Sequence, residues 1–316
     1  MQPILPAIIF GGIVATVFAL AALIIVRRIL QKIKWSRGGV RPQGLSWPDR
    51  IVLGLAAGGA LCFAYGYFIE PYWPSVTHIQ IKTAKFKAGS RPIRLVQISD
   101  LHCDSKPRLE ERLPALIANE RPDLIVFTGD SINSPDGLPV LKTCLTSLAQ
   151  IAPTFVVKGN WDMDFWHHLD LFGSTGVQEL NGDMVVVNKE GSGICIAGIA
   201  AGDESRAAAT TDKMPAEAFN IFLYHYPDLI FEIAARHVDL YCAGHTHGGQ
   251  VALPFYGALI TLSRFGKRFE SGLYRVDQTL LYVNRGLGMD GGMVPRVRFF
   301  ARPEITVFDI QPDTGG

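Results

Sequence analysis

The sequence is short of features that mark several common classes of protein. Its 316 residues carry 30 basic and 29 acidic side chains, a formal net charge of +1 at pH 7. A charge so close to zero gives no bulk attraction to nucleic acid or to a strongly acidic partner, so we expect neither. The five cysteines are scattered and suggest no disulfide framework: Cys62, Cys103, Cys144, Cys195 and Cys242.

The sequence also lacks three motifs that signal well-known catalytic chemistries. It has no glycine-rich phosphate-binding loop, no G-x-S-x-G nucleophile elbow and no cysteine–histidine nucleophile pair. Tandem repeats and low-complexity tracts are absent as well. If the chain is a hydrolase, its nucleophile is therefore water activated by metal ions rather than a side chain.

Charged residues are missing from two long apolar runs near the N-terminus. Hydrophobic residues make up 48% of the chain, and its mean hydropathy is +0.20. Residues 5–26 and 51–69 hold no charge, and roughly 20 apolar residues suffice for a helix to cross a bilayer. The first run is too long for the core of a signal peptide and follows no basic region. The sequence therefore predicts two transmembrane helices in preference to buried core helices.

A basic segment with a single acid, Asp49, lies between the two runs. The positive-inside rule places such a short loop in the cytoplasm. We therefore expect a multi-pass protein of the inner (plasma) membrane with its catalytic domain on the periplasmic or extracellular side. Lys82, Lys85 and Lys87 reduce the charge asymmetry without reversing it. The basic residues of the segment are Arg27, Arg28, Lys32, Lys34, Arg37, Arg41 and Arg50.

We divide the chain into a membrane anchor (residues 1–73), a polar connector (74–92) and a soluble domain (93–316). In the soluble domain, short apolar runs rich in β-branched residues alternate with longer helical stretches. This alternation is typical of a central sheet in a layered α/β fold. The strand-like runs are IRLVQIS, DLIVFTG, PTFVVKG, GICIAGIA, FNIFLYH, VDLYCAG, LLYVNRG and EITVFDI.

Several of these runs end in a residue that can bind a metal ion. In layered α/β domains ligands gather beyond the carboxyl ends of the strands, so scattered positions can converge on one cleft. Carboxylates, imidazoles and one amide oxygen suit two borderline divalent ions rather than a zinc–thiolate site. Each motif alone is more often a turn or a cap, and their ordered recurrence is the specific signal. The candidate ligands are Asp100, His102, Asp130, Asn160, His225, His245 and His247.

The positions of these residues suggest how two ions would be held. A site about 3.5–4 Å across needs a ligand shared by both ions, and Asp130, at the tip of a central strand, is our candidate. Alternate residues of a strand point the same way, so Asp100 and His102 can share a face, as can His245 and His247. Glycines beside the ligands would let the backbone turn sharply and approach closely: Gly129, Gly159, Gly244 and Gly248.

The ordered motifs SDLHCD, FTGDSIN, GNWD, YHYPD and GHTHGGQ resemble those of the calcineurin-like metallophosphoesterases. The stretches GGQVALPFYGAL and LYVNRGLGMDGGMVPRVRFFARPEI resemble the membrane-associated bacterial branch of that family. The resemblance implies a four-layer αββα sandwich with a binuclear metal site, in which Mn²⁺ is the first expectation and Fe, Zn or Co are alternatives. It places Asp100, His102, Asp130 and His247 around one ion, and Asp130, Asn160, His225 and His245 around the other.

The chain departs from the family pattern at Trp161. The family motif is G-N-H-[DE], whose His is thought to protonate the leaving oxygen, and here an indole replaces it while Asp162 is retained. General acid help is worth roughly 10²–10⁴-fold and matters most for a basic leaving group such as an alkoxide. Pyrophosphatases of the superfamily that cleave the lipid A precursor UDP-2,3-diacylglucosamine also lack this His. The substitution therefore favours a diphosphate substrate. His102, His167 and His168 are alternative donors.

We predict a membrane-anchored binuclear-metal phosphohydrolase that cleaves a phosphate ester or diphosphate bond of a lipid-linked or nucleotide-type substrate. The expected partners are this phosphorylated substrate and the lipid bilayer. One expectation conflicts with another, because a lipid A precursor is cytoplasmic while the basic segment places the domain outside. The alternative function is a catalytically weak membrane receptor for phosphorylated ligands, which the intact ligand set argues against. The predicted catalytic residues are Asp130, Asn160, Asp162 and His102, and the predicted substrate contacts are Trp161 and Arg285.

Overall fold

The computed structural model describes residues 5–189, 191–290 and 296–313. Residues 291–295, which fall within the C-terminal stretch that carries the family resemblance, lie outside the described residues. The chain divides into two compact units, one ending at Ile69 and the other starting at Glu70.

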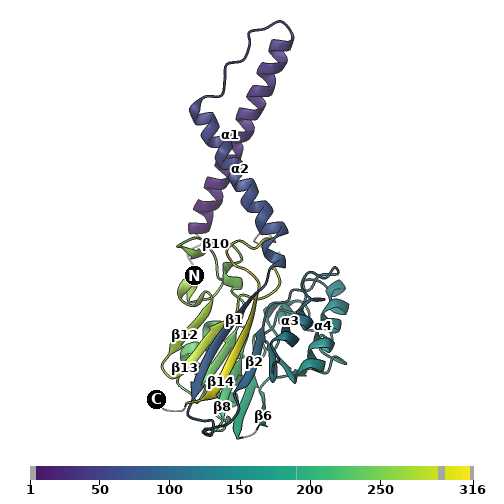
Figure 1. The fold of residues 1–316 in the computed structure, drawn as a ribbon, viewed down its shortest axis with the longest axis vertical. Coiled ribbons are helices and arrows are strands. Elements are labelled where there is room, and N and C mark those ends of the chain that lie inside the picture. Colours follow the sequence, from purple (N-terminus) through teal and green to yellow (C-terminus); the bar gives the residue numbers. More distant parts are fainter. Residues whose placement is uncertain (1–4, 190, 291–295, 314–316) are drawn as a thin grey trace. The chain divides into compact units, whose positions relative to one another are not determined.

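The N-terminal unit consists of the helices α1 (Leu5–Ser36) and α2 (Trp47–Phe68), both drawn in Figure 1. By length and composition, both could cross a membrane. At 1.5 Å per residue the 32 residues of α1 extend about 48 Å, more than the roughly 30 Å of a hydrocarbon core. Helix α1 thus extends beyond its apolar run into the basic segment and ends at Ser36. Only residues 37–46 form the loop between the two helices. Helix α2 begins with a capping box, in which Ser46 and Asp49 exchange hydrogen bonds.

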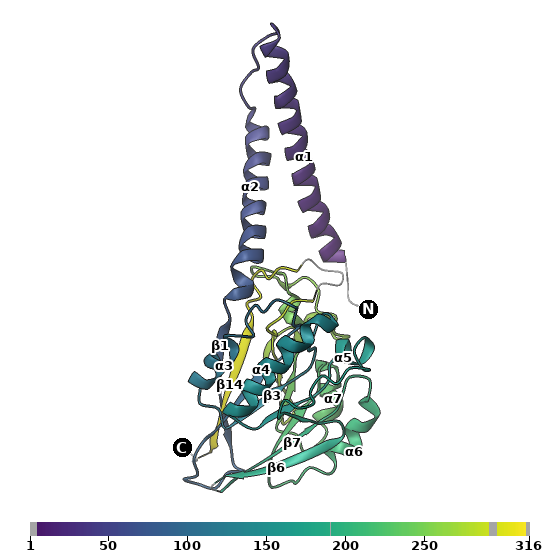
Figure 2. The same cartoon turned by 90° about the vertical axis from the view of Figure 1, so that its right-hand side faces the viewer.

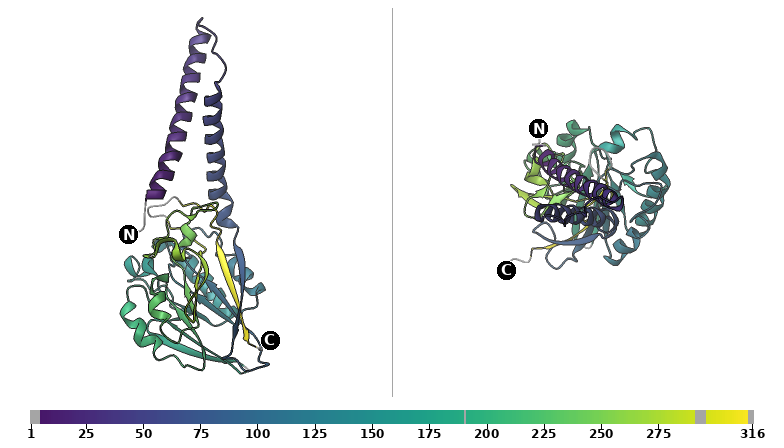
Figure 3. Two further views of the ribbon diagram at one scale, coloured as in Figure 1. Left: turned by 90° about the vertical axis from the view of Figure 1, so that its left-hand side faces the viewer. Right: turned by 90° about the horizontal axis from the view of Figure 1, so that it is seen from above.

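The second unit contains two six-stranded sheets. The first has the strand order β1-β14-β2-β3-β4-β5, and all its neighbours are parallel except β14 and β2. Strands β1 and β14 run side by side over their whole length, as Figures 1 and 3 show. The bounds are β1 Ser75–Thr83, β2 Ile93–Ile98, β3 Leu124–Phe127, β4 Thr154–Val156, β5 Gln178–Glu179 and β14 Glu304–Pro312.

The second sheet has the order β12-β13-β9-β8-β7-β6, with parallel central strands and an antiparallel strand at each edge. A separate short hairpin pairs β10 with β11. The bounds are β6 Asp183–Lys189, β7 Ser192–Gly198, β8 Phe219–Leu223, β9 Leu240–Ala243, β10 Ala252–Leu253, β11 Gly257–Ala258, β12 Gly272–Val276 and β13 Thr279–Val283.

Helices cover the outer face of each sheet. Helices α3 (Leu113–Asn119) and α4 (Leu138–Ile151) lie beside the first sheet in Figure 1, and α6 (Ala207–Thr211) and α7 (Ile230–Ile233) lie beside β6 and β7 in Figure 2. The remaining helical elements are α5 Asn160–Asp164 and the 3₁₀ turns η1 Glu70–Tyr72, η2 Pro135–Gly137, η3 Glu204–Arg206, η4 Pro227–Leu229, η5 His247–Gly249 and η6 Gly266–Phe269.

Three apolar clusters separate these layers. One joins α3 and α4 to the first sheet through buried side chains such as Leu145 and Phe127. A second lies between the two sheets and includes Leu95 and Ile221, and a third joins α6 and α7 to the second sheet. The predicted four-layer αββα sandwich is therefore confirmed, because a sheet that is apolar on both faces needs a covering layer on each.

The structure differs from the expected connector over residues 74–92. Residues Ser75–Thr83 form β1, which pairs with β14 at the edge of the first sheet. Most of β1 alternates between exposed and half-buried side chains, and only its end, at Ile81 and Thr83, is fully buried. An edge strand with one solvated face carries many polar residues. Its sequence therefore resembles that of a polar linker.

Because Ile81 is 4% exposed and packs in the cluster between the sheets, Ile81→Ala should destabilise the domain by about 2–5 kcal/mol. Val76→Ala, at an exposed position of the same strand, is the matched control and should cost less than about 1 kcal/mol. Urea unfolding of the detergent-solubilised protein measures both. Equal effects would show that β1 does not contribute to the core.

Candidate metal centre

The predicted ligands follow the carboxyl ends of five strands, three from the first sheet and two from the second. Asp100 and His102 follow β2, Asp130 follows β3, and Asn160 begins α5 after β4. In the second sheet His225 follows β8, and His245 and His247 follow β9. Most of these side chains are buried, and Asn160 and His245 are half-buried.

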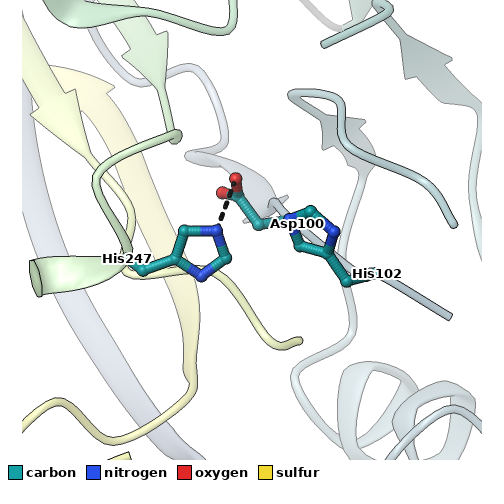
Figure 4. A group of neighbouring side chains, drawn as sticks. All are labelled: Asp100, His102 and His247. Carbon is teal, nitrogen blue, oxygen red and sulfur yellow. Dashed lines mark ion pairs between the residues drawn. The ribbon is translucent and has the colours of Figure 1, made fainter. Parts of the chain in front are cut away.

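The structure brings the ligand atoms together in two groups. The ligand atoms of Asp100, His102 and His247 lie within 4.8 Å of one another, and Figure 4 shows these side chains converging. The ligand atoms of Asp100, Asp130 and His225 form a second such group. Asp130 Oδ2 also lies 3.5 Å from His102 Nε2 and 3.3 Å from His225 Nε2. Both carboxylates thus lie between the histidines of the two groups.

These groups match the two predicted shells in part, and His245 belongs to neither group. The first group contains three of the four residues expected around one ion. In the second, Asp130 and His225 meet as expected, and the backbone N–H of Trp161, next to Asn160, donates to Asp130 Oδ1 at 2.9 Å. The residue common to both groups is Asp100, whereas the sequence suggested Asp130 as the shared ligand. Which carboxylate bridges the ions stays a prediction.

Several buried polar atoms in the cluster have no hydrogen-bond partner. They are both ring nitrogens of His102, Nε2 of His225 and Oδ1 of Asn160, although the two Nε2 atoms lie at ion-pair distance from Asp130 Oδ2. A buried polar atom left unpaired costs about 1–3 kcal/mol, so such a concentration calls for a ligand. All four atoms are donors of the kind that divalent cations bind. The residues present therefore fit the metal ions that the sequence predicts.

Contacts behind two histidines set which nitrogen faces the cluster. Nδ1 of His225 lies 2.7 Å from the carbonyl oxygen of Thr128, so it carries the proton and leaves Nε2 free for a metal ion. Nε2 of His245 lies 3.4 Å from the carbonyl oxygen of Leu262, which leaves Nδ1 free. Orientation of a metal-binding histidine by a backbone carbonyl is the usual arrangement around bound metals.

Left-handed backbone conformations aim the ligands into the cluster. Five of the predicted ligands have positive φ: Asp100 (48°), His102 (42°), Asp130 (60°), His245 (71°) and His247 (51°). Holding a residue other than glycine at positive φ costs of order 1–3 kcal/mol, and residues strained in this way cluster at functional sites. The expectation that Asp100 and His102 share the face of an extended strand is therefore wrong, because β2 ends at Ile98 and both residues lie in the turn beyond it.

Close approach of the backbone to the carboxylates explains two of the predicted glycines. A Cβ on Gly159 would lie 2.2 Å from Asp130 Oδ1, and one on Gly244 would lie 2.4 Å from Asp100 Oδ2. Neither position has room for a larger residue without displacement of a ligand. These glycines therefore act by the absence of a side chain.

The pKa values of the ionisable side chains in the cluster differ widely. Burial, opposed by His225, raises the pKa of Asp100 to about 7. Burial would also raise the pKa of Asp130, but the positive charge of His225 outweighs it and lowers this pKa to about 2. Burial lowers the pKa of His225, yet the Asp130 carboxylate raises it to about 9. Burial lowers the pKa of His102 to about 4 and that of His245 to about 3, so both are neutral and able to bind metal.

Asp162, predicted as catalytic, is bound to the backbone of the ligand loops. Its buried carboxylate accepts hydrogen bonds from the N–H groups of Asp130 (3.0 Å), Ser131 (2.9 Å) and Gly159 (2.9 Å). Burial raises its pKa to about 6. These contacts support a positioning role, in which Asp162 holds the loop after β3 against the loop after β4.

The two predicted substrate contacts have different surroundings. The half-buried ring of Trp161 lies edge-on to His102, with ring centroids 5.3 Å apart, so it borders the cluster. Arg285 instead contacts Glu304 at 3.1 Å and donates to Ser75 Oγ at 2.9 Å and to the carbonyl of Arg302. These contacts hold the guanidinium within the domain, and a role for Arg285 in phosphate binding stays a prediction.

Sequence reasoning missed two residues at the cluster. Arg298 is fully buried, and its Nη2 lies 3.3 Å from Nδ1 of His247 while its Nη1 donates to the carbonyl of Ala301. Tyr226 follows His225 directly, and its ring centroid lies 4.4 Å from that of His245. Neither residue lies at a spacing from the predicted ligands that would mark it as part of the site. The only signal in the sequence is that both residues lie in stretches that carry the family resemblance, YHYPD and RVRFFARPE.

Comparison with known proteins identifies the family. The family model of calcineurin-like phosphoesterases matches residues 93–249. The metallophosphoesterase YkuE of Bacillus subtilis is 35% identical over 272 residues, which cover 81% of this chain and 92% of YkuE. The chain therefore belongs to the calcineurin-like metallophosphoesterase family and is a metal-dependent phosphoester hydrolase.

Two other relatives carry more specific names. Phosphodiesterase YaeI of Escherichia coli is 28% identical over 260 residues, covering 78% of this chain and 92% of YaeI. UDP-2,3-diacylglucosamine pyrophosphatase LpxG of Chlamydia muridarum is 26% identical over 314 residues, covering 80% of this chain and 94% of LpxG. The relatives thus include one protein named for a phosphodiester bond and one named for a diphosphate bond.

Removal of the Asp162 carboxylate should loosen the ligand loops. Asp162→Ala leaves three backbone N–H groups buried without a partner, which predicts a loss of about 2–4 kcal/mol in the free energy of unfolding and a fall in bound metal. Asp164→Ala, at an exposed position of the same helix, is the control. Urea unfolding and elemental analysis test both variants. A stable Asp162→Ala protein with full metal content would contradict the positioning role.

Metal affinity should rise with pH, because a cation displaces the protons that the metal-free cluster holds. The pKa of about 9 at His225 predicts release of one proton, and thus about a tenfold gain in affinity per pH unit, between pH 7 and 9. Below pH 7 the proton on Asp100 adds to this dependence. Calorimetry of Mn²⁺ binding in buffers of different ionisation enthalpy counts the protons. An affinity that stays constant from pH 6 to 9 would rule this out.

Proposed function

We propose that this protein is a membrane-anchored binuclear-metal phosphohydrolase that cleaves a phosphate ester or diphosphate bond, with a lipid-linked diphosphate as the favoured substrate class. The observation that carries the proposal is the set of buried ligand atoms without partners on His102, Asn160 and His225, next to two carboxylates. A binding protein would need some of these atoms, whereas hydrolysis uses the complete set.

The proposal assigns roles to the residues of the chain. Two divalent ions, of which Mn²⁺ is the first expectation, would supply an activated water and offset negative charge on phosphorus. Asp100, His102 and His247 would hold one ion, and Asn160, His225 and His245 the other, with Asp130 and Asp100 between them. The neutral amide of Asn160 would leave more positive charge for the substrate than a third carboxylate. Asp162 keeps these loops in position.

The departure at Trp161 supports a diphosphate. An indole gives no proton to a leaving oxygen, and a phosphate leaving group needs less such help than an alkoxide. Trp161 borders the cluster beside His102, where its ring can contact the organic part of a substrate. One relative is named as a UDP-2,3-diacylglucosamine pyrophosphatase, a name that refers to cleavage of a diphosphate bond. It supports the same class of substrate.

The two apolar helices support a substrate in or at a bilayer. Both are long and apolar enough to cross a membrane, and the apolar side chains that they expose have no evident use in a soluble enzyme. By the positive-inside rule, the basic residues at the end of α1 would lie in the cytoplasm and the catalytic unit on the opposite side. We therefore propose the class of lipid-linked diphosphates and not the cytoplasmic lipid A precursor itself.

A second candidate function is a catalytically weak receptor for phosphorylated ligands. The absence of the family histidine at position 161 favours it, because a receptor needs no proton donor. The completeness of the ligand set disfavours it. The two functions differ in one observable, which is turnover of a phosphorylated substrate by the metal-loaded protein.

The test is hydrolysis by the full-length, detergent-solubilised protein with Mn²⁺. We expect turnover of a nucleoside-diphosphate lipid, and loss of at least about 10²-fold in kcat/KM for Asp130→Ala and Asn160→Ala, because each removes a group that holds the ions. Asp136→Ala, an exposed carboxylate in the same connection after β3, is the matched control and should be unchanged. Metal binding without turnover of any phosphate ester or diphosphate would favour the receptor.

A further inference from the structure

Tyr226 borders the metal cluster on the side of the second sheet. It follows His225 at the end of β8, and its half-buried ring lies edge-on to His245, with centroids 4.4 Å apart, and 5.3 Å from the ring of His225. The hydroxyl of buried Tyr241 donates to the carbonyl oxygen of Tyr226 and so fixes its backbone. The phenol is therefore held against two predicted metal ligands.

The hydroxyl of Tyr226 differs from those of its neighbours. Tyr224 donates to Glu204, and Tyr241 donates to the backbone, so both hydroxyls are committed within the domain. Within the described part of the chain, the hydroxyl of Tyr226 has no such partner. An ordinary phenol has a pKa of about 10, so this hydroxyl keeps its proton at neutral pH and is a hydrogen-bond donor. Its ring contacts two predicted ligands, which places the phenol at the border of the cluster.

We propose that the Tyr226 hydroxyl donates a hydrogen bond to the leaving-group oxygen of the substrate, in a site where Trp161 replaces the family histidine. The inference rests on the proposed hydrolase function. As the bond from phosphorus to the leaving oxygen breaks, its electron pair stays on that oxygen, and water provides the oxygen that bonds to phosphorus. The phenol O–H bond remains intact, and its dipole stabilises the developing negative charge.

The other candidate donors are less well placed. His102 has both ring nitrogens buried within the ligand set, and a nitrogen that binds metal has no proton to give. His167 and His168 are exposed and contact each other. The indole of Trp161 is the remaining rival, because its N–H can also donate a hydrogen bond.

Leaving-group chemistry separates these possibilities. The full-length protein with Mn²⁺ is given two phosphodiesters that differ only in the leaving group, an alkyl alcohol or 4-nitrophenol. For Tyr226→Phe, which keeps the ring and removes one oxygen, we expect a fall of about 10–100-fold in kcat/KM on the alkyl ester. The loss on the nitrophenyl ester should be less than about threefold, because nitrophenolate needs little stabilisation. Bound metal and melting temperature should match the wild type.

Tyr256→Phe is the matched control, because Tyr256 is 43% exposed in the turn between β10 and β11, and both rates should be unchanged. Equal losses on both esters, or loss of bound metal, would show that Tyr226 only packs the histidines and would overturn the inference. A selective loss on the alkyl ester in Trp161→Phe but not in Tyr226→Phe would assign the donor to the indole instead. Wild-type protein that hydrolyses a diphosphate but not the alkyl ester would overturn this inference and leave the hydrolase function intact. Wild-type protein that hydrolyses neither these esters nor a diphosphate would refute both.

Discussion

The structure depends on two carboxylates, Asp100 and Asp130, held out of water among four imidazoles. His225 has a raised pKa and carries a positive charge. This charge only partly offsets the repulsion between the two carboxylates and the cost of burying them. Histidine nitrogens and an amide oxygen remain without partners around them. Such a cluster is unfavourable by itself. Divalent cations remove the repulsion and satisfy the unpaired atoms, so metal binding and the stability of this region are coupled.

The rest of the domain holds this unfavourable arrangement in place. Three layers of apolar packing anchor the strands, and the strands bring their carboxyl ends to one place. Beyond the strand ends the chain turns through left-handed conformations that a free peptide would rarely adopt. Asp162 fastens two of the turns to each other, and glycines such as Gly159 and Gly244 let the backbone reach the carboxylates. The core thus stabilises a strained site that the local sequence would not maintain.

The surroundings of the cluster indicate which reactions it can favour. The family motif that GNWD resembles has a histidine at the position of Trp161, and this chain has an indole there. The structure places aromatic rings on two sides of the cluster, Trp161 beside His102 and Tyr226 beside His245. One of them carries a hydroxyl. A site of this kind suits a substrate with an organic group next to the phosphorus and a leaving group that needs a hydrogen bond rather than a full proton transfer.

The sequence alone determined the layered α/β class, the two apolar helices and the seven candidate ligands. Strand periodicity and polar residues at strand ends are local features, so they can be recognised in the linear sequence. Only the tertiary structure decided that residues 75–83 belong to the first sheet, that Asp100 is common to both ligand groups, and that Asp162 binds the backbone of the ligand loops. It also revealed Arg298 and Tyr226 beside the histidines. These facts depend on contacts between residues far apart in the chain, and neither hydropathy nor spacing encodes which distant atoms will meet.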